Sequence, residues 1–500
     1  MSPMSHTPAA HAEPGSAGVA PSASRGDAWS RLSGRWLALP IGAACFALNV
    51  IQLTRAAPWR DEAASWISGQ RSLPELWTML GNIDAVHGGY YFLLYGWQRL
   101  FGDSILSLRL LSALAIGVTA GLIFLLAREL FGPRCAPWAG LLAGALPPAT
   151  WAAGEARSAA VSCAATAAAM LALAVALRRD TAWSWTIWAG TAIVSIHLFL
   201  FSGLAFLGLL PALLALTATV RRHAVVAGLV VLGVCTPFAV VTFGQGGQLA
   251  WLADHRLTAR EVLIRVFWRS DPLTGWVGSA ALVIGLAVLV SLLRTPATRT
   301  PAWLVIGWLI GPVAVLAGVH AWRPVFLPRY LVFTVGATAL VLGVLIARLP
   351  RGWLRATATL LAIAALVPSL LESREVYSKD TSFGAYVKLQ RLARPGDGVL
   401  PLQADTDQPF WAFPSRVDGL VELSQDAGPA WRSVRLFPAP PTPKQVAATA
   451  APARIWLIAK DALPSAGLNS AAAVFEAGGY RAGSPVPLSN GLVAILVERA

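Results

Sequence analysis

Residues 36–62 read WLALPIGAACFALNVIQLTRAAPWRDE, a long apolar run that ends in a cluster of charge. No Asp, Glu, Lys, Arg or His occurs in residues 36–53. About 20 predominantly apolar residues suffice for a helix to cross a bilayer. The stretch therefore predicts a membrane helix whose far end leads directly into the acidic pair Asp61 and Glu62.

Apolar runs of this kind recur along the 500-residue chain, which is 56% hydrophobic but only 13% charged. A typical soluble domain has about 25% charged residues, so a water-covered surface is not expected here. We predict a polytopic α-helical membrane protein with about eleven transmembrane helices. The expected spans are residues 36–53, 106–127, 137–152, 160–177, 183–200, 202–220, 224–243, 275–293, 302–320, 331–347 and 356–371.

Basic residues are concentrated in alternate loops between these runs, and this alternation predicts the orientation. Cytoplasmic loops of membrane proteins carry an excess of Lys and Arg, so we place the basic loops and the amino terminus in the cytoplasm. The basic residues of these loops are Arg31, Arg35, Arg128, Arg134, Arg178, Arg179, Arg221, Arg222, Arg294, Arg299, Arg348, Arg351 and Arg355. The net charge of +14 is thus assigned to membrane orientation, and nucleic acid is not an expected partner.

Composition divides the chain into three regions. Residues 1–30 are rich in Ala, Pro, Ser and Gly and predict a disordered cytoplasmic tail. Residues 31–371 form the predicted transmembrane module, with a long first outer loop at 54–105. Residues 372–500 are richer in charge, Pro and Gly and predict a small extracytoplasmic α/β domain. Its expected strands are 398–402, 454–459 and 492–498, and its expected helices lie near 384–393 and 469–478.

The remaining ionisable residues gather at the outer ends of the predicted helices. A charge in lipid is costly unless it is paired, so a shared level predicts a common site at the outer membrane surface. These residues are Asp61, Glu62, Asp84, His87, Arg109, Glu155, Arg157, His197 and Arg329. Structural interpretations stay open: the acidic pair could cap a short helix, Glu155 and Arg157 could pair, Arg329 could extend to the interface, and the histidines could be packing residues.

Motifs for metal or nucleotide chemistry are not found in the sequence. Four cysteines lie in or beside apolar runs without CxxC spacing, so neither a zinc site nor a disulfide framework is expected. They are Cys45, Cys135, Cys163 and Cys235. No HExxH or GxxxxGK[ST] motif occurs, and a nucleotide-dependent reaction is therefore not indicated.

An ordered set of segments resembles the GT-C superfamily of membrane glycosyltransferases. The resemblance is to the protein O-mannosyltransferase and aminoarabinose-transferase branch, particularly its actinobacterial mannosyltransferase-like members. It covers about residues 36–347, in order and with similar spacing. The matching segments are Asp61-Glu62, His87 to Tyr91, residues 94–101, 108–112 and 126–132, Glu155-Ala156-Arg157, and Arg329-Tyr330.

The resemblance implies a GT-C-like fold and an inverting sugar transfer outside the cytoplasm, in a multi-pass protein of the cell membrane. The donor would be a sugar, by resemblance mannose, on a polyprenyl monophosphate, and the acceptor a hydroxyl of a protein, glycan or glycolipid. Asp61 would be the catalytic base, and Glu62 would shape the site or assist. The donor phosphate or sugar would be held by His87, Glu155, Arg157, Arg329 and Tyr330.

One departure from the family pattern concerns His87. Many relatives have His-Pro-Pro where this chain has His87-Gly88-Gly89, which puts the role of His87 in question. Some relatives bind a divalent metal. No cofactor is required by this sequence, and it offers no clear ligand set for a metal, so the binding of a divalent metal stays open at this point. The alternative function is a lipid-linked sugar flippase or transporter, for which polar residues near the midplane and internal repeats would be expected.

Overall fold

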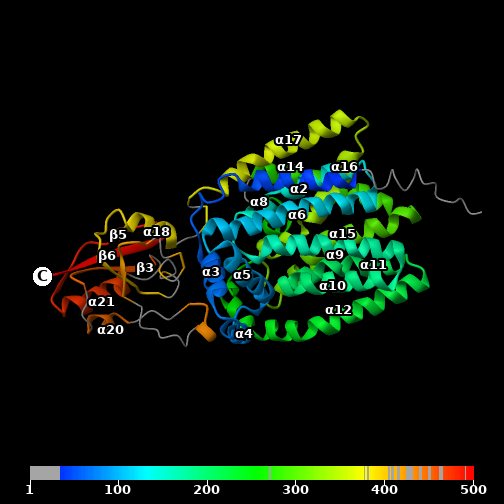
Figure 1. Cartoon of the computed structure of the whole chain (residues 1–500). Helices are drawn as coiled ribbons and strands as arrows, with labels where there is room; N and C mark the ends of the chain where they lie inside the picture. Colours follow the sequence, from blue (N-terminus) through cyan, green and yellow to red (C-terminus); the bar gives the residue numbers. More distant parts are fainter. Residues whose placement is uncertain are drawn as a thin grey trace, which may run out of the picture. The chain divides into compact units, whose positions relative to one another are not determined.

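The computed structural model describes residues 34–500 except 270–271, 377, 380–381, 404–405, 407–409, 411, 414–416, 424–431, 438–441, 449–451, 461–464 and 490. The predicted tail, residues 1–30, lies outside the described residues. Helices dominate the chain up to residue 372 (Figure 1). They are η1 (Arg35–Leu37), α2 (Ala38–Val50), α3 (Arg60–Gln70), α4 (Leu73–Asn82), η2 (Ala85–His87), α5 (Gly88–Phe101), α6 (Ile105–Phe131), α7 (Ala136–Ala145), α8 (Pro147–Ala153), α9 (Ser158–Arg179), α10 (Ala182–Leu198), η3 (Leu200–Gly208), α11 (Leu209–Leu213), α12 (Ala218–Gly244), η4 (Gly246–Leu252), η5 (Glu261–Arg265), α13 (Val266–Trp268), α14 (Pro272–Leu292), α15 (Pro296–His320), η6 (Pro328–Thr334), α16 (Val335–Ala347) and α17 (Gly352–Glu372).

The predicted helical membrane architecture is confirmed. Seven helices among the described residues are long and apolar enough to cross a membrane. They span Ile105–Phe131, Ser158–Arg179, Ala218–Gly244, Thr274–Leu292, Pro296–His320, Pro328–Ala347 and Gly352–Glu372. The other four predicted spans are helical but shorter or interrupted. The run at 137–152, for example, divides into α7 and α8 because Leu146 is extended before Pro147.

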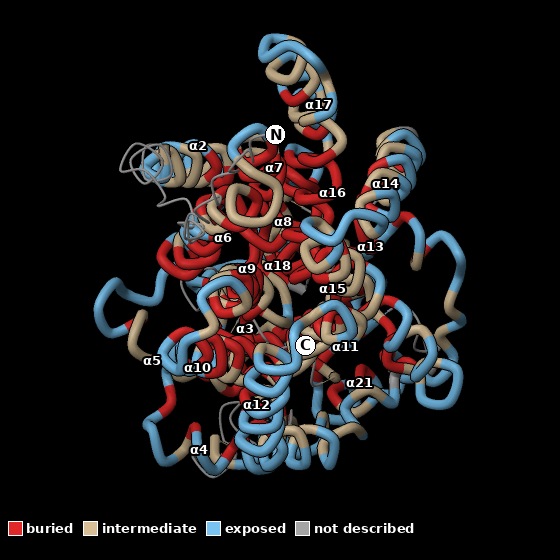
Figure 2. Tube along the Cα trace, turned by 90° about the vertical axis from the view of Figure 1, so that its right-hand side faces the viewer, coloured by how far each residue is buried: buried red, intermediate tan, exposed pale blue. Residues whose placement is uncertain are grey.

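The helices differ in how much of their apolar surface packs against protein. In α6, 67% of the apolar window is buried, and in the Pro328–Ala347 helix 78%, but only 22% is buried in α12, α14 and α17. Figure 2 shows the buried residues gathered along α6, α9 and α16, with α12, α14 and α17 largely exposed. Apolar helices that remain exposed in this way present their side chains to lipid.

The predicted outer loop at 54–105 is helical rather than irregular. It contains α3, α4, η2 and α5. Acidic residues in the first turn suit the partial positive charge of a helix amino terminus, and α3 begins with Asp61 and Glu62 there. Helix α4 begins with a capping box between Ser72 and Glu75. Both carboxylates of the acidic pair are therefore fixed on a rigid element rather than on a mobile loop.

A mixed sheet forms after residue 398, where strands were expected. Its strand order is β2-β1-β3-β6-β4, with β5 paired to β6. The strands are β1 (Gly398–Pro401), β2 (Val421–Glu422), β3 (Arg454–Lys460), β4 (Tyr480–Ala482), β5 (Val486–Pro487) and β6 (Leu492–Arg499), and the helices are α18 (Ser382–Leu389), α20 (Pro443–Ala447) and α21 (Ser465–Glu476). Ile455 and Leu457 of β3 pack with α21, and Trp456 and Ile458 pack with α18, so both faces of the sheet are covered.

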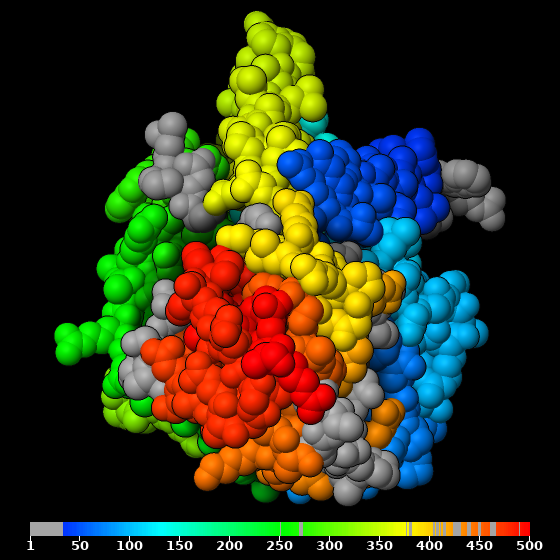
Figure 3. Space-filling view, turned by 90° about the vertical axis from the view of Figure 1, so that its left-hand side faces the viewer, coloured from blue at the N-terminus to red at the C-terminus, as the bar shows by residue number. Residues whose placement is uncertain are grey.

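The C-terminal region is joined to the first outer loop by a buried guanidinium. Arg71, at the end of α3, has no exposed surface and donates to the carbonyl oxygens of Arg432 (2.7 Å) and Arg435 (2.6 Å). In return Arg432 lies 3.3 Å from the carboxylate of Glu75. Figure 3 shows the face of the molecule on which the C-terminal residues, orange to red, lie.

A close approach of the backbones of α15 and η3 supplies a test of the bundle. An added Cβ on Gly307 of α15 would lie 2.0 Å from the Cα of Gly208 in η3. We expect Gly307→Ala to force the two helices apart and destabilise the protein by about 1–3 kcal/mol, seen as a lower unfolding midpoint in detergent. Gly190→Ala on α10, where nothing lies within 4 Å, is the matched control. Equal midpoints for the two variants would contradict this packing.

Candidate active site

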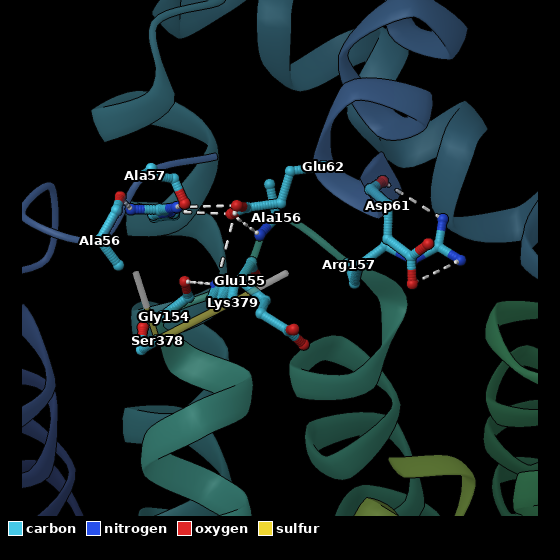
Figure 4. A network of polar contacts seen from close by, with 12 residues as sticks. Ala56, Ala57, Asp61, Glu62, Gly154, Glu155, Ala156, Arg157, Ser378 and Lys379 are labelled. Atoms are coloured by element: carbon cyan, nitrogen blue, oxygen red, sulfur yellow. Dashed lines mark hydrogen bonds and ion pairs between the residues drawn. The ribbon is translucent and has the colours of Figure 1, made fainter. Parts of the chain in front are cut away.

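The sequence-predicted site residues come from five separate segments and meet near the amino terminus of α3. Asp61 and Glu62 lie on α3, and His87 ends η2. Glu155 and Arg157 lie in the turn between α8 and α9, and Arg329 and Tyr330 open η6. Figure 4 shows Glu62 and Asp61 pointing to opposite sides, with the turn at 154–157 between them.

We call the part of the site around Glu62 its inner side and the part around Asp61 its outer side. Glu62 is buried at the centre of the inner side. Its side chain has no exposed surface, and its two oxygens accept from Arg109 Nε (2.8 Å) and Nη2 (2.7 Å). The backbone N–H of Ala156 donates to Glu62 Oε1 at 2.9 Å. Lys379 Nζ lies 3.7 Å from Glu62 Oε2. One carboxylate therefore holds α6, the turn before α9 and the segment after α17 together.

Arg109 uses its remaining donors to fix the chain between the first membrane helix and α3. Its Nη1 donates to the carbonyl oxygens of Leu53 (2.9 Å) and Ala56 (2.8 Å). Burial by itself would raise the pKa of Glu62, but the charges of Arg109 and Lys379 outweigh burial and lower that pKa to about 2. The carboxylate is thus ionised, and both of its oxygens accept hydrogen bonds.

Asp61 faces the outer side and keeps access to solvent. Its side chain is 20% exposed, with Oδ2 lying 3.4 Å from Arg329 Nη1 and 3.8 Å from Arg157 Nη2. Neither contact is a short bidentate pair of the kind that Glu62 makes. Asp61 is therefore an accessible carboxylate between two guanidinium groups from different segments.

On the outer side, Arg157 contacts several of the other site residues. Its Nη1 donates to the Tyr91 hydroxyl at 3.0 Å, and it lies 4.0 Å from Asp84 Oδ2. The hydroxyl of Tyr91 in turn donates to Asp84. Burial opposes the charge on Arg157, but the carboxylates of Asp61 and Asp84 overcome this effect and raise its pKa. Asp84 has a left-handed backbone, with φ of 60°, that places its side chain in this group.

His87 orients Arg157 rather than offering a free nitrogen. Its Nε2 lies 2.9 Å from Arg157 Nη2, which can only donate, so Nε2 accepts and Nδ1 carries the proton. Nδ1 then donates to Ser158 Oγ at 2.7 Å. Burial, reinforced by the charge of Arg157, lowers the pKa of His87 well below its usual value. The neutral ring stacks on Phe199 with centroids 5.6 Å apart.

The Gly88-Gly89 departure from the family pattern has a packing reason. Helix α5 meets the end of α10 here, and a Cβ on Gly89 would lie 2.4 Å from the carbonyl oxygen of His197. A larger residue at position 89 would move His87 away from Arg157. His197 itself bonds to the Ile193 carbonyl (2.9 Å) and stacks on Phe238, as a packing residue does.

Glu155 and Arg157 do not pair, so the interfacial ion pair considered from the sequence is wrong. Arg157 is directed to Asp61 and Asp84, while Glu155 Oε1 is buried and has no hydrogen-bond partner among the residues that the structure describes. Burial raises the pKa of Glu155 against the opposing effect of Lys379. Its carboxyl group points away from the other labelled residues in Figure 4.

Arg329 and Tyr330 lie on the outer side with Asp61. The Arg329 guanidinium is the more exposed of the two cations, at 37%, and lies 5.5 Å from the Trp59 ring centroid. Tyr330 stacks on Phe201 with centroids 5.3 Å apart. Snorkelling alone does not describe Arg329, because its guanidinium is directed to a carboxylate.

Sequence reasoning did not assign roles to three residues that complete the site. Tyr91 and Arg109 lay inside segments of the family resemblance, and Arg109 belonged to the group expected at a common site, but nothing in the sequence indicated which residues either of them would contact. Lys379 is the first lysine in the chain, since every basic side chain before it is Arg or His. Among the described residues, no group of three or more His, Cys, Asp or Glu side chains is arranged to hold a metal ion.

The buried Glu62–Arg109 pair yields a stability prediction. We expect Glu62→Gln to lower the free energy of unfolding by about 3–5 kcal/mol, because it leaves Arg109 and Lys379 buried without a carboxylate. The pKa of Glu62 is lowered from 4.5 to about 2, so its contribution is present above pH 4.5 and is lost as the pH falls towards 2. Unfolding midpoints in detergent measure both effects. Glu476→Gln, at an exposed carboxylate of α21, should leave the midpoint unchanged.

Known proteins resemble this chain in sequence over part of its length and in fold over most of it. A family described as dolichyl-phosphate-mannose-protein mannosyltransferase matches residues 89–241. No curated protein sequence matches. The structure of ArnT from Cupriavidus metallidurans bound to undecaprenyl phosphate has a TM-score of 0.56 at 15% identity, covering 93% of this chain and 98% of ArnT.

Two structures of an archaeal enzyme extend the comparison. The Archaeoglobus fulgidus oligosaccharyltransferase in its apo form has a TM-score of 0.51 at 12% identity, covering 88% of this chain and 71% of that one. The oligosaccharyltransferase AglB from the same organism, in complex with an inhibitory peptide and a dolichol-phosphate, has a TM-score of 0.52 at 11% identity, covering 92% and 73%. The chain therefore shares its fold with ArnT and with the archaeal oligosaccharyltransferase, as the resemblance in its sequence predicted.

Proposed function

We propose that this protein transfers a sugar from a polyprenyl-monophosphate donor to an acceptor hydroxyl at the outer face of the cytoplasmic membrane. The observation that carries the proposal is the accessible carboxylate of Asp61 between Arg157 and Arg329, 3.8 and 3.4 Å away. A base can take the proton of the acceptor hydroxyl, and nearby cations can stabilise the charge that develops on the leaving phosphate. The fold similarity to proteins bound to undecaprenyl phosphate or dolichol-phosphate supports a lipid-linked donor.

The proposed reaction is a single displacement with inversion. The acceptor oxygen attacks C1 of the sugar while Asp61 takes the hydroxyl proton. The bond between C1 and the phosphate oxygen breaks, and the electron pair leaves with the polyprenyl phosphate. Negative charge therefore grows on the leaving phosphate, where Arg157 and Arg329 can stabilise it. The phosphate would replace part of the contact that both cations make with Asp61.

Glu62 and His87 receive supporting rather than chemical roles in this proposal. Both oxygens of Glu62 are engaged by Arg109, and its side chain is fully buried, so we assign it to shaping the site instead of proton transfer. Both nitrogens of His87 are engaged as well, which supports a role in orienting Arg157. Tyr330 remains assigned to the sugar or phosphate. Glu155, which the sequence also suggested for this role, has a buried carboxyl group that points away from Asp61, so we assign it no contact with the donor. We favour mannose because the matching family is named for mannosyl transfer.

Replacing the proposed base tests the reaction directly. We expect Asp61→Asn to lower kcat by about 100-fold or more, because the amide cannot accept the hydroxyl proton. Transfer from radiolabelled polyprenyl-phosphate-mannose into membrane extracts measures the rate. Asp254→Asn, at an exposed carboxylate that follows η4, is the matched control and should keep the wild-type rate.

The assay separates this proposal from the alternative of a flippase or transporter. A folded Asp61→Asn protein that transfers at the wild-type rate would exclude Asp61 as the base. Wild-type protein that moves the lipid-linked sugar across proteoliposomes but transfers nothing would instead favour transport. The ionisable groups described above lie at one end of the helices rather than at their midplane, which supports transfer.

The proposed orientation, with a cytoplasmic amino terminus and residues 372–500 outside, can be tested by labelling. All four native cysteines are buried, so a maleimide is expected to label an introduced, exposed cysteine rather than a native one. We expect an impermeant maleimide to label Gly81→Cys, at an exposed position of α4, in intact cells. Pro350→Cys, in the basic loop before α17, should react only after permeabilisation. The reverse pattern would invert the assigned topology.

A further inference from the structure

The segment that follows the last membrane helix runs against the candidate active site. After α17, Arg374 is buried and donates to the carbonyl oxygen of Asn49 at 3.1 Å. The carbonyl oxygen of Val376 accepts from the backbone N–H of Ala57 at 3.1 Å. The segment therefore passes along the chain that connects the first membrane helix to α3, before it continues into the C-terminal region.

Lys379 is the residue of this segment that contacts the candidate active site. Its side chain is 1% exposed, and Nζ donates to the carbonyl oxygen of Gly154 at 2.6 Å (Figure 4). Nζ also lies 3.7 Å from Glu62 Oε2 and 5.5 Å from the ring centroid of Trp151. A flexible, strongly hydrated lysine is costly to bury, so these contacts must offset its desolvation.

The turn that presents Arg157 is fixed at each of its preceding residues. Lys379 holds the carbonyl oxygen of Gly154, and Ser112 Oγ donates to the carbonyl oxygen of Glu155. Glu62 accepts from the N–H of Ala156 at 2.9 Å. Lys379 is the member of this set that comes from outside the predicted transmembrane module.

We propose that Lys379 is a positioning residue that clamps the turn at 154–157 so that Arg157 faces Asp61. This inference rests on the proposed sugar transfer, which it deepens. The clamp acts through the carbonyl oxygen of Gly154 and through Glu62, and Lys379 touches no reacting atom. It makes the junction between the membrane module and the C-terminal region a part of the active centre.

The charge of Lys379 is the feature that the clamp requires. The ionisable groups around it are Glu62, Arg109, Glu155 and Arg374. Burial lowers the pKa of Lys379 to about 8, against the attraction of Glu62. The folded protein binds this proton less tightly than the unfolded chain, so the lysine loses its charge as the pH rises through about 8 while the protein stays folded.

Kinetics of Lys379→Met and Lys379→Arg test the clamp. We expect Lys379→Met to lower kcat on the order of 100-fold with a much smaller change in KM for the donor, because misplacement affects the transition state most. Lys379→Arg should recover most of kcat. Wild-type activity should decline above about pH 8, and Lys379→Arg should keep its activity to higher pH. Lys388→Met, at an exposed lysine of α18, is the matched control and should behave as wild type.

Amide hydrogen exchange gives a measurement that does not depend on activity. Peptides covering residues 150–160 should exchange faster in Lys379→Met than in wild type, and at the wild-type rate in Lys388→Met. Unchanged exchange in a folded Lys379→Met protein, a kcat within twofold of wild type, or the same alkaline decline in Lys379→Arg would each overturn the clamp. Wild-type protein that transfers no sugar would overturn the proposed function instead, while the exchange comparison would still decide the clamp.

Discussion

The buried pair between Glu62 and Arg109 is the interaction on which the rest of the site depends. Both side chains are fully removed from solvent, and the guanidinium meets the carboxylate through two short hydrogen bonds. Removing either partner leaves an uncompensated charge in the interior, a cost that few other contacts in a protein match. Through Leu53, Ala56 and Ala156, the pair also fixes the backbone on two sides of the site.

This pair explains how two adjacent carboxylates acquire different tasks. Successive residues on an α-helix point about 100° apart, so Asp61 and Glu62 cannot face the same environment. Glu62 turns inwards to Arg109 and is immobilised, which fixes the rotation of α3 about its axis. Asp61 is thereby directed to the outer side, where Arg157 and Arg329 approach it from other segments. The structural carboxylate, Glu62, and the proposed base, Asp61, are therefore adjacent in the sequence.

The cations of the site also divide into two groups. Arg109, Arg374 and Lys379 are buried and hold backbone carbonyl oxygens, whereas Arg157 and Arg329 retain some exposure and face Asp61. A buried guanidinium whose donors are all used by carbonyl groups stabilises a fold, and one with partly exposed N–H groups can donate to a phosphate. His87 keeps Arg157 in place without adding charge, since it is neutral and acts as an acceptor towards the guanidinium.

The sequence by itself determined the helical membrane architecture, the seven helices long enough to cross a membrane, three of the six strands of the described C-terminal sheet and the segments in which the candidate site residues lie. These follow from local properties: the length of apolar runs, the alternation of side chains and the presence of charge at helix ends. The sequence could not decide which charges meet, because Glu62 and Arg109 are 47 positions apart and Lys379 is still further away. Only the tertiary structure separated Glu155 from Arg157, buried Glu62 and directed Lys379 to Gly154. Those outcomes depend on burial and on distances between segments remote in sequence, and no local pattern encodes either quantity.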